Sequence, residues 1–299
     1  MKVRVVEVGP RDGLQNESKT VPTDSKVAFV DALSDAGYEE IEVSAFVSPQ
    51  WIPQLADAEE VFARIRRKDS TVYSALVPNE RGLERALGAK VRKVAVFTAA
   101  SETFNRKNVN ASIQGSIARF RPVVDGARRE KIPVRGYVST AFWCPYEGKI
   151  APDAVLGVVR QLLDLGVDEI SIGDTIGKAV PAEVHALLDL LLDHVDQDRL
   201  AMHFHDTYGT AIANVLASYE RGIAVFDSSA GGVGGCPFAP GAAGNVATED
   251  LISALARAGA SLSPDLERVR AASALLSTVL GRPLRSRGRE APSGGGPSA

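Results

Sequence analysis

Residues 134–172, VRGYVSTAFWCPYEGKIAPDAVLGVVRQLLDLGVDEISI, contain the unit that decides the fold. A β-branched run at 134–139 is followed by a segment of helical period at 152–165 and then by a second β run at 169–172. Gly166 lies between the last two, and glycine often ends a helix because it adopts the left-handed conformation without strain. The stretch therefore predicts a strand, a helix and a second strand parallel to the first.

The same alternation extends along most of the chain. Eight β runs occur without a break in composition, at residues 3–8, 41–45, 71–76, 93–97, 134–139, 169–172, 200–204 and 224–228. Eight strands alternating with helices is the pattern of a (β/α)8 TIM barrel, although an open doubly wound sheet has the same order along the chain. We predict the α/β class and the closed barrel, because an open sheet with so many strands is near the upper limit of size.

Three segments follow the eighth β run. Residues 231–245 hold six glycines, which predicts a loose lid loop over the strand ends. Residues 249–257 and 265–280 have helical period and predict extra C-terminal helices. We therefore expect one domain over residues 1–281, and a disordered tail over 282–299, which is rich in Arg, Gly, Pro and Ser.

Composition excludes several classes of protein. The 34 basic and 37 acidic residues leave a net charge of −3, which argues against binding nucleic acid or an anionic membrane by bulk charge. No run approaches the ~18 apolar residues of a membrane span. Two cysteines, Cys144 and Cys236, are too few for a disulfide framework. We expect a cytoplasmic protein in a reducing compartment.

Two histidines predict a metal site. His203 and His205 are two residues apart on one β run, so both side chains face the same side, and Asp12 follows the first β run. Imidazole and oxygen ligands without a thiolate suit Mg²⁺ or Mn²⁺. The alternative interpretation is a pair of core histidines with ordinary hydrogen-bond partners.

Two further features allow more than one interpretation. Cys236 lies in the glycine-rich segment and is either a reactive thiol or an inert small apolar residue. A loop at 101–110 carries Arg106, Lys107 and Asn108, which suit a long anionic cofactor but are also typical of solvated loop charge.

Several separated phrases carry a resemblance to a known family. They are VEVGPRDGLQNE (6–17), IEVSAFVSPQWIPQLAD (41–57), RGYVS (135–139), CPYEGKI (144–150), GDTIG (173–177), HFHDTYG (203–209) and DSSAGGVGGCPFAPGAAGN (227–245). Together, and in this order, they resemble the hydroxymethylglutaryl-CoA lyases. These belong to a superfamily of metal-dependent barrels with an Asp-Arg-Glu signature, which also contains condensing synthases and aldolases.

The resemblance implies roles for particular residues. It implies a metal site formed by Asp12, His203, His205 and Asn245. It implies catalytic roles for Cys236, Arg11, Asp12, Glu42 and Asp174. It places Gln15 in the same cavity, and Lys107 and Asn108 at the coenzyme A moiety.

The implied activity is a metal-dependent cleavage of 3-hydroxy-3-methylglutaryl-CoA to acetyl-CoA and acetoacetate, as in leucine degradation. The implied partners are an acyl-CoA substrate and further copies of the chain, in a homodimer or larger oligomer. The alternatives are a lyase for a longer-branched 3-hydroxy-3-acylglutaryl-CoA, or a related acyl-CoA condensing enzyme or aldolase.

Two departures from the family's usual residues lead to further expectations. The bulky pair Phe142–Trp143 predicts an acyl pocket of altered size. Phe204 stands between the two histidines and is expected to point away from the metal, because side chains alternate along a strand.

Overall fold

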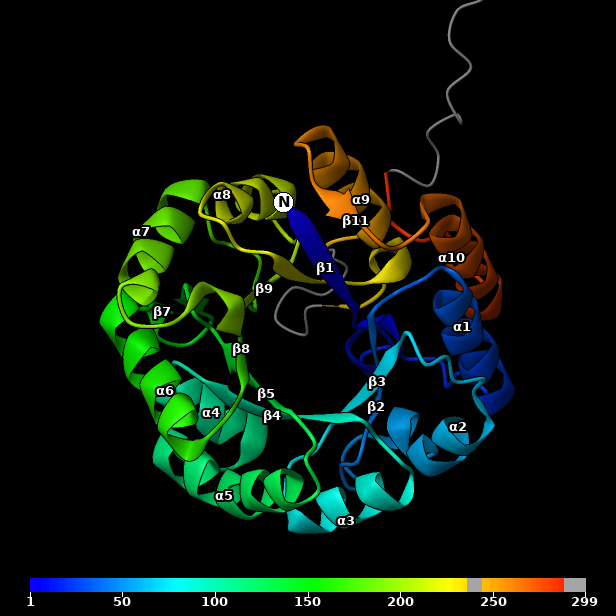
Figure 1. Ribbon diagram of the computed structural model, residues 1–299, viewed down its shortest axis with the longest axis horizontal. Helices are drawn as coiled ribbons and strands as arrows, with labels where there is room; N and C mark the ends of the chain where they lie inside the picture. Colours follow the sequence, from blue (N-terminus) through cyan, green and yellow to red (C-terminus); the bar gives the residue numbers. More distant parts are fainter. Residues whose placement is uncertain (236–243, 288–299) are drawn as a thin grey trace, which may run out of the picture.

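Eight parallel strands close into a barrel in a computed structural model, which describes residues 1–235 and 244–287 (Figure 1). They are β1 Lys2–Glu7, β2 Glu40–Ala45, β3 Val72–Leu76, β4 Lys93–Ala99, β5 Val134–Ser139, β8 Glu169–Asp174, β9 Leu200–Phe204 and β10 Val225–Ser228. Each pairs with the next, and β10 pairs back with β1, where Val6 lies opposite Asp227. This closure confirms the predicted TIM barrel and excludes the open sheet.

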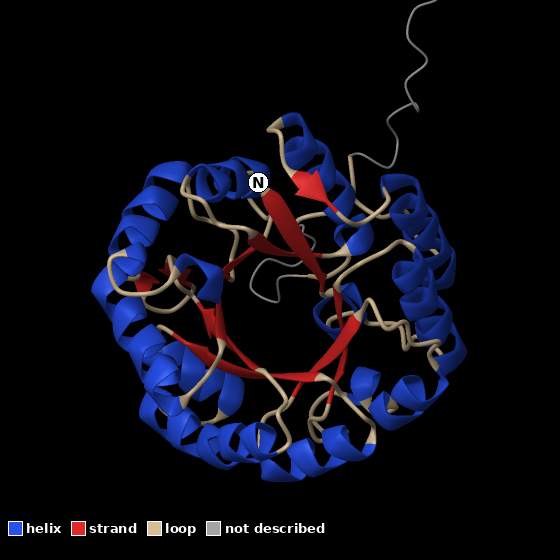
Figure 2. Ribbon diagram, viewed as in Figure 1, coloured by secondary structure: helices blue, strands red, loops and turns tan. Residues whose placement is uncertain are grey.

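Helices form a ring around the barrel (Figure 2). They are α1 Thr23–Asp35, α2 Ala58–Arg64, α3 Glu80–Gly88, α4 Glu102–Val109, α5 Ile113–Arg129, α6 Pro152–Leu165, α7 Pro181–Leu192, α8 Ala211–Glu220, α9 Thr248–Arg257 and α10 Leu266–Leu280. The two C-terminal helices complete the ring, since α9 packs beside α8 and α10 packs beside α1. None of the helices in the described ranges is long and apolar enough to cross a membrane.

Two local elements differ from the sequence-based expectation. Residues 101–110 are predicted as a loop, but most of them form α4. The Ser101 hydroxyl accepts a hydrogen bond from the Phe104 amide at 3.1 Å, and Asn110 ends the helix in the left-handed conformation with φ 51°. The loop after β5 contains a short hairpin of β6 Trp143–Cys144 and β7 Gly148–Lys149, which the sequence analysis does not predict.

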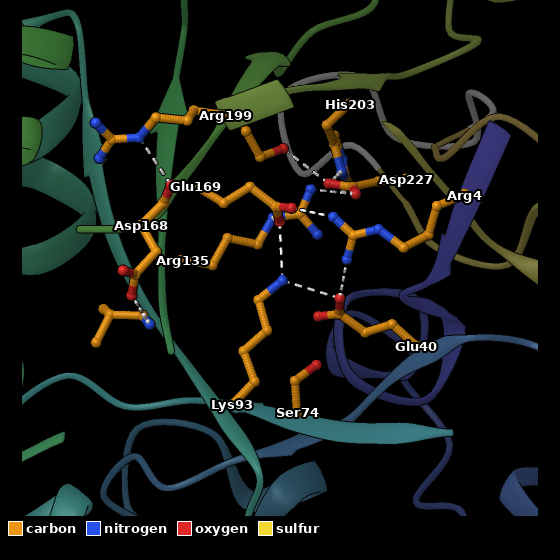
Figure 3. Close-up of polar contacts among 12 residues, drawn as sticks. Arg4, Glu40, Ser74, Lys93, Arg135, Asp168, Glu169, Arg199, His203 and Asp227 are labelled. Carbon is orange, nitrogen blue, oxygen red and sulfur yellow. Dashed lines mark hydrogen bonds and ion pairs between the residues drawn. The ribbon is translucent and has the colours of Figure 1, made fainter. Parts of the chain in front are cut away.

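Ion pairs fill the lower part of the barrel interior, where branched apolar side chains are usual (Figure 3). Lys93 Nζ lies 2.9 Å from carboxylate oxygens of both Glu40 and Glu169, and Arg135 Nη2 lies 2.7 Å from Asp227 Oδ1. With Arg4, which pairs with Glu40 and Glu169, three cations balance three carboxylates. The balanced network forms a buried floor beneath the carboxyl ends of the strands.

The segment after α10 packs onto the barrel. Leu284 is 5% exposed and covers Gly231, where a Cβ atom would lie 2.4 Å from a Leu284 methyl carbon. The Arg285 amide donates to the Gly231 carbonyl at 3.0 Å. Residues 282–287 are therefore ordered and not part of the expected disordered tail. The reason is that the apolar Leu284, in an otherwise polar stretch, packs against Gly231. The rest of the expected tail lies outside the described residues.

Candidate active site

Three potential metal ligands meet at the carboxyl end of the barrel. One ligand atom each from Asp12, His203 and His205 lies within 4.8 Å of the others. Asp12 belongs to a tight turn, Gly9–Gly13, directly after β1, whereas His203 is on β9 and His205 follows it. The cluster confirms the predicted proximity of these residues.

Asn245 completes the cluster. It pairs with His205 in an isolated β-bridge, and its Nδ2 donates to Asp12 Oδ2 at 2.9 Å. Its buried Oδ1 has no hydrogen-bond partner among the described residues, and the same is true of His205 Nδ1. Buried polar atoms are normally paired, so these two atoms suit a ligand such as a metal ion. The donor set of one carboxylate, one amide oxygen and two imidazoles fits a divalent cation.

A carboxylate orients the first histidine (Figure 3). His203 Nδ1 lies 3.2 Å from Asp227 Oδ2, which leaves Nε2 for a metal. Asp227 accepts hydrogen bonds from Ser171 Oγ at 2.8 Å and from Arg135 Nη2 at 2.7 Å. Metal-binding histidines are commonly fixed in this way by a carboxylate on the second ring nitrogen.

The surrounding charges set the protonation of these ligands. Burial would raise the pKa of Asp12, but the Arg11 guanidinium and the two histidines outweigh it and lower the pKa to about 2. Burial, together with the neighbouring His203, lowers the pKa of His205 to about 4. The carboxylate is therefore ionised and the second imidazole neutral near neutral pH, which are the forms that bind a metal.

Arg11 is held rigidly beside the cluster. Its Nε donates to Glu42 Oε2 at 2.5 Å and its Nη1 to Asp12 Oδ1 at 2.6 Å, and the side chain is almost fully buried. The guanidinium also lies 5.3 Å from the centre of the Tyr137 ring. Among the described residues the buried Glu42 Oε1 has no partner, so this carboxylate oxygen can act as an acceptor. Arg11, Asp12 and Glu42 thus form the predicted constellation.

The turn that carries Arg11 and Asp12 requires a glycine. A Cβ atom at Gly13 would lie 2.5 Å from Val233 Cγ1 and 2.9 Å from the Val233 carbonyl oxygen. Because that approach involves backbone, a larger residue would displace either the turn or the strand-end loop at Val233.

Asp174, for which the resemblance implies a catalytic role, is bound by backbone amides of its own loop. Its two carboxylate oxygens accept the amides of Lys178 at 3.1 Å and Ala179 at 3.0 Å, and it does not belong to the described cavity wall. Burial raises its pKa to about 6, although these hydrogen bonds oppose the shift. In this geometry Asp174 stabilises the loop after β8.

A cavity of about 650 Å³ extends from the metal cluster to the surface. Its inner end is lined by Arg11, Asp12, His203, His205 and Gln15, and the buried Gln15 Oε1 has no partner. The outer end is lined in part by Lys107 and Asn108 on α4, and one wall is apolar, with Val47, Ile52, Leu76 and Phe97. The structure thus brings the predicted coenzyme A residues and the metal cluster to one cavity.

The two departures from the family's residues lie outside the described cavity wall. Phe204 is 1% exposed and its ring centre lies 6.3 Å from that of Phe142, which confirms that it points away from the metal cluster. Trp143 lies against Lys178, whose Nζ is 3.8 Å from the ring centre. Neither Phe142 nor Trp143 is among the residues that line the described cavity, so the expected change in the acyl pocket stays a prediction.

Cys236, the predicted catalytic thiol, lies outside the described residues, as does most of the predicted lid, 236–243. Gly235, which precedes it, lines the cavity. Asp227 is a functional candidate that the sequence analysis misses. The signal available in the sequence was an acidic residue in the eighth β run. The contact of Asp227 with His203 follows only from the pairing of β10 with β9.

Known proteins resemble this chain along almost its whole length. The HMGL-like family model matches residues 2–276. A hydroxymethylglutaryl-CoA lyase of Pseudomonas mevalonii is 49% identical over 95% of both chains. A Pseudomonas aeruginosa protein named 3-hydroxy-3-isohexenylglutaryl-CoA/hydroxy-methylglutaryl-CoA lyase is 48% identical over 97% of both chains. The structure of an HMG-CoA lyase from Acinetobacter baumannii with coenzyme A and 3-methylmalate superposes with a TM-score of 0.91, at 40% identity, over 96% of this chain and 93% of the other. The chain therefore belongs to the HMGL-like family.

Proposed function

We propose that the protein is a metal-dependent carbon–carbon lyase that cleaves 3-hydroxy-3-methylglutaryl-CoA to acetyl-CoA and acetoacetate. The observation that carries the proposal is the cavity itself, which joins the Asp12, His203 and His205 cluster to a mouth lined by Lys107 and Asn108. Such a cavity fits a substrate with a reactive acyl end and a long coenzyme end. The names of the similar lyases support the same substrate.

Asp12, His203, His205 and Asn245 would hold the divalent cation, and we propose Mg²⁺ or Mn²⁺ from the hard oxygen donors of this set. When bound, such an ion supplies polarisation of the substrate's hydroxyl and carboxylate oxygens. Asp227 keeps the His203 ring in place, and Asn245 keeps its amide oxygen free by donating its amide protons to Asp12 and to the Val233 carbonyl.

The proposed cleavage needs no second substrate, because both products are formed from the atoms and bonding electrons of one substrate molecule. The C3 hydroxyl loses its proton, the C2–C3 bond breaks, and the bonding pair passes to the thioester as an enolate. The enolate then takes a proton at C2 to give acetyl-CoA, and C3 becomes the ketone of acetoacetate. We assign Arg11 to the enolate oxygen, because a fixed guanidinium stabilises developing negative charge.

The two proton transfers need a base and an acid. We assign Glu42 to the first, because its Oε1 is buried and has no partner among the described residues, whereas both oxygens of Asp174 are bound by backbone amides. We keep Cys236 for the protonation of the enolate carbon. An unperturbed cysteine thiol has a pKa of ~8.5, close enough to neutral for a proton transfer.

A lyase for a longer branch at C3 is the second candidate. The apolar wall at Val47, Ile52, Leu76 and Phe97 favours it, and the Pseudomonas aeruginosa relative carries isohexenylglutaryl-CoA in its name. An acyl-CoA condensing enzyme or aldolase, the other alternative, would instead consume acetyl-CoA and a 2-oxoacid.

One assay tests these functions together. Purified protein is stripped with EDTA, dialysed and reloaded with Mg²⁺ or Mn²⁺, and acetoacetate is measured by a coupled reaction from the methyl substrate. We expect no activity without metal and recovery with it. Full activity in excess EDTA would contradict the metal assignment. Substrates with longer branches, and acetyl-CoA with a 2-oxoacid, are assayed in parallel.

The pathway, the cellular compartment and the oligomeric state are proposed from the family resemblance. By resemblance to the family, we propose action in leucine degradation in the cytoplasm, as a homodimer or larger oligomer. Light scattering of the purified protein tests the oligomeric state.

A further inference from the structure

Tyr137 has a buried hydroxyl that the described residues leave without a partner. It lies on β5 and lines the cavity, and its side chain is 6% exposed. Its Oη atom has no hydrogen-bond partner in the described structure. An unpaired buried hydroxyl is costly, so such groups are normally satisfied by protein, water or ligand. The orphaned hydroxyl at the cavity wall therefore indicates a ligand atom opposite it.

Packing does not explain the hydroxyl. The ring belongs to an apolar cluster with Ala45, Leu55, Leu76 and Ala95. A phenylalanine ring would make the same contacts with these side chains, since it has the same shape without the oxygen. The packing of the core therefore does not require the hydroxyl. It lowers the stability of the fold unless a ligand in the cavity forms a hydrogen bond with it.

Two guanidinium groups and one histidine ring lie beside the Tyr137 ring. The guanidinium carbons of Arg11 and Arg135 lie 5.3 Å and 5.1 Å from the ring centre, and the His203 ring packs edge-on at 6.4 Å. Both guanidinium groups are already paired with carboxylates, Arg11 with Asp12 and Glu42, and Arg135 with Asp227. The kind of ligand atom therefore follows from the hydroxyl itself, whose proton suits an electron-rich oxygen. A phenol is ordinarily protonated near neutral pH, so it donates to such an oxygen.

We propose that Tyr137 Oη donates a hydrogen bond to an oxygen of the bound acyl group, next to Arg11. This rests on the proposed function in that the acyl group is the one that is cleaved. Tyr137 is then a catalytic residue that touches the substrate, and its ring packs beside both Arg11 and His203. If the oxygen is the one that gains charge during cleavage, removal of the hydroxyl lowers kcat; if it is a carboxylate oxygen, removal raises KM.

The test is Tyr137→Phe, which removes the hydroxyl alone. We expect kcat/KM for 3-hydroxy-3-methylglutaryl-CoA to fall by about 10- to 1,000-fold, the range for loss of one donor to substrate oxygen. The Mn²⁺ affinity should stay within about twofold and Tm should not fall, because a buried unpaired group is removed. Tyr219→Phe on α8, whose hydroxyl accepts from the N-terminal amine at 3.3 Å, is the matched control and should keep its kcat/KM.

The outcomes separate this inference from the proposed function. A Tyr137→Phe enzyme within twofold of the parent in both kcat and KM overturns the hydrogen bond and leaves the lyase activity standing. If the parent protein does not cleave the substrate, equilibrium titration with the same thioester replaces the assay. Binding weakened at least tenfold in Tyr137→Phe then supports the hydrogen bond while the reaction fails, and unchanged binding overturns both.

Discussion

His203 Nδ1 lies 3.2 Å from Asp227 Oδ2, and the two residues are directly opposite each other on neighbouring strands. Arg135 approaches the same carboxylate from below and links it to the ion pairs on the barrel floor. Burial would raise the pKa of Asp227, but Arg135 and His203 outweigh it, so the pKa lies well below the usual range for Asp. The ionised Asp227 carboxylate therefore keeps the His203 imidazole in one tautomer, with its proton on Nδ1 and its Nε2 directed at the metal cluster.

Asp227→Asn tests this support. An amide in place of the carboxylate removes the charge and presents an N–H group to the ring, so we expect the Mn²⁺ affinity to fall by about 10- to 100-fold and kcat to fall with it. Isothermal titration with Mn²⁺ measures the affinity directly. Asp189→Asn, a half-exposed carboxylate on α7 that pairs with Arg221, serves as the control. Unchanged affinity in Asp227→Asn would mean that His203 is oriented by packing alone.

Arg11→Met removes the donor assigned to the enolate. We expect kcat to fall by a factor on the order of 10³ or more while the Mn²⁺ affinity changes little, because a transition-state donor is lost and no metal ligand is. Arg66→Met, which removes an exposed surface guanidinium, is the control. Steady-state kinetics at saturating metal measures kcat. A kcat within tenfold of the parent's would mean that another group stabilises the enolate oxygen.

Cys236→Ser tests the thiol that the sequence singles out. Serine is nearly isosteric but a far weaker acid, so kcat should fall by at least ~100-fold while the Mn²⁺ affinity and the Tm stay close to the parent's. Cys144→Ser is the matched control, since Cys144 is buried and its Sγ lies 3.0 Å from Ser101 Oγ, a contact that a hydroxyl retains. Near-normal turnover in Cys236→Ser would mean that another group in the cavity donates the proton to the enolate carbon.

The sequence predicts the barrel well because its strands are short apolar runs bounded by turn residues. The runs at Val134–Ser139 and Leu200–Phe204 are confirmed to the residue. It also predicts the metal cluster, because the spacing of His203 and His205 places both on one face. Such signals are local and need no knowledge of which strands are neighbours.

What the sequence does not predict depends on contacts between distant segments. Asp227 becomes a partner of His203 through the pairing of β9 with β10 and through Arg135 on β5, which no local pattern records. Likewise, α4 has a mostly polar sequence with weak helical period, and it is stabilised by its Ser101 cap and by the buried Phe104.

Leu284→Ala tests the docking of the C-terminal segment. Leu284 is buried over Gly231, at the start of the loop that lines the cavity. Removing this side chain should cost about 2 kcal/mol or more of unfolding free energy, as for other buried leucines, and should be measurable by urea denaturation. Leu284→Met keeps the volume and should cost less than about 1.5 kcal/mol. Equal stability of the alanine variant and the parent would mean that the segment contributes no packing energy.

Glu7 gives a stability prediction that depends on pH. Its Oε1 accepts the amides of Gly9 at 2.9 Å and Ala230 at 3.0 Å, and its Oε2 accepts the Thr248 hydroxyl at 3.0 Å. Full burial raises the pKa of Glu7 from 4.5 to about 7, although the hydrogen bonds oppose the shift. The folded protein thus binds this proton more tightly than the unfolded chain does.

The sign follows from that difference. A carboxyl group whose pKa is raised on folding stabilises the folded state below its unfolded pKa, and this contribution is lost as the pH rises through the folded value. Between pH 5 and 8 the free energy of unfolding of the parent should fall by about 2 to 3 kcal/mol relative to Glu7→Gln, which cannot ionise. Urea denaturation of both proteins at fixed metal concentration measures the difference, and Glu84→Gln on the exposed face of α3 controls for loss of a surface carboxylate. A difference that is constant or that grows with pH would show that the hydrogen bonds from Gly9, Ala230 and Thr248 keep Glu7 ionised despite its burial.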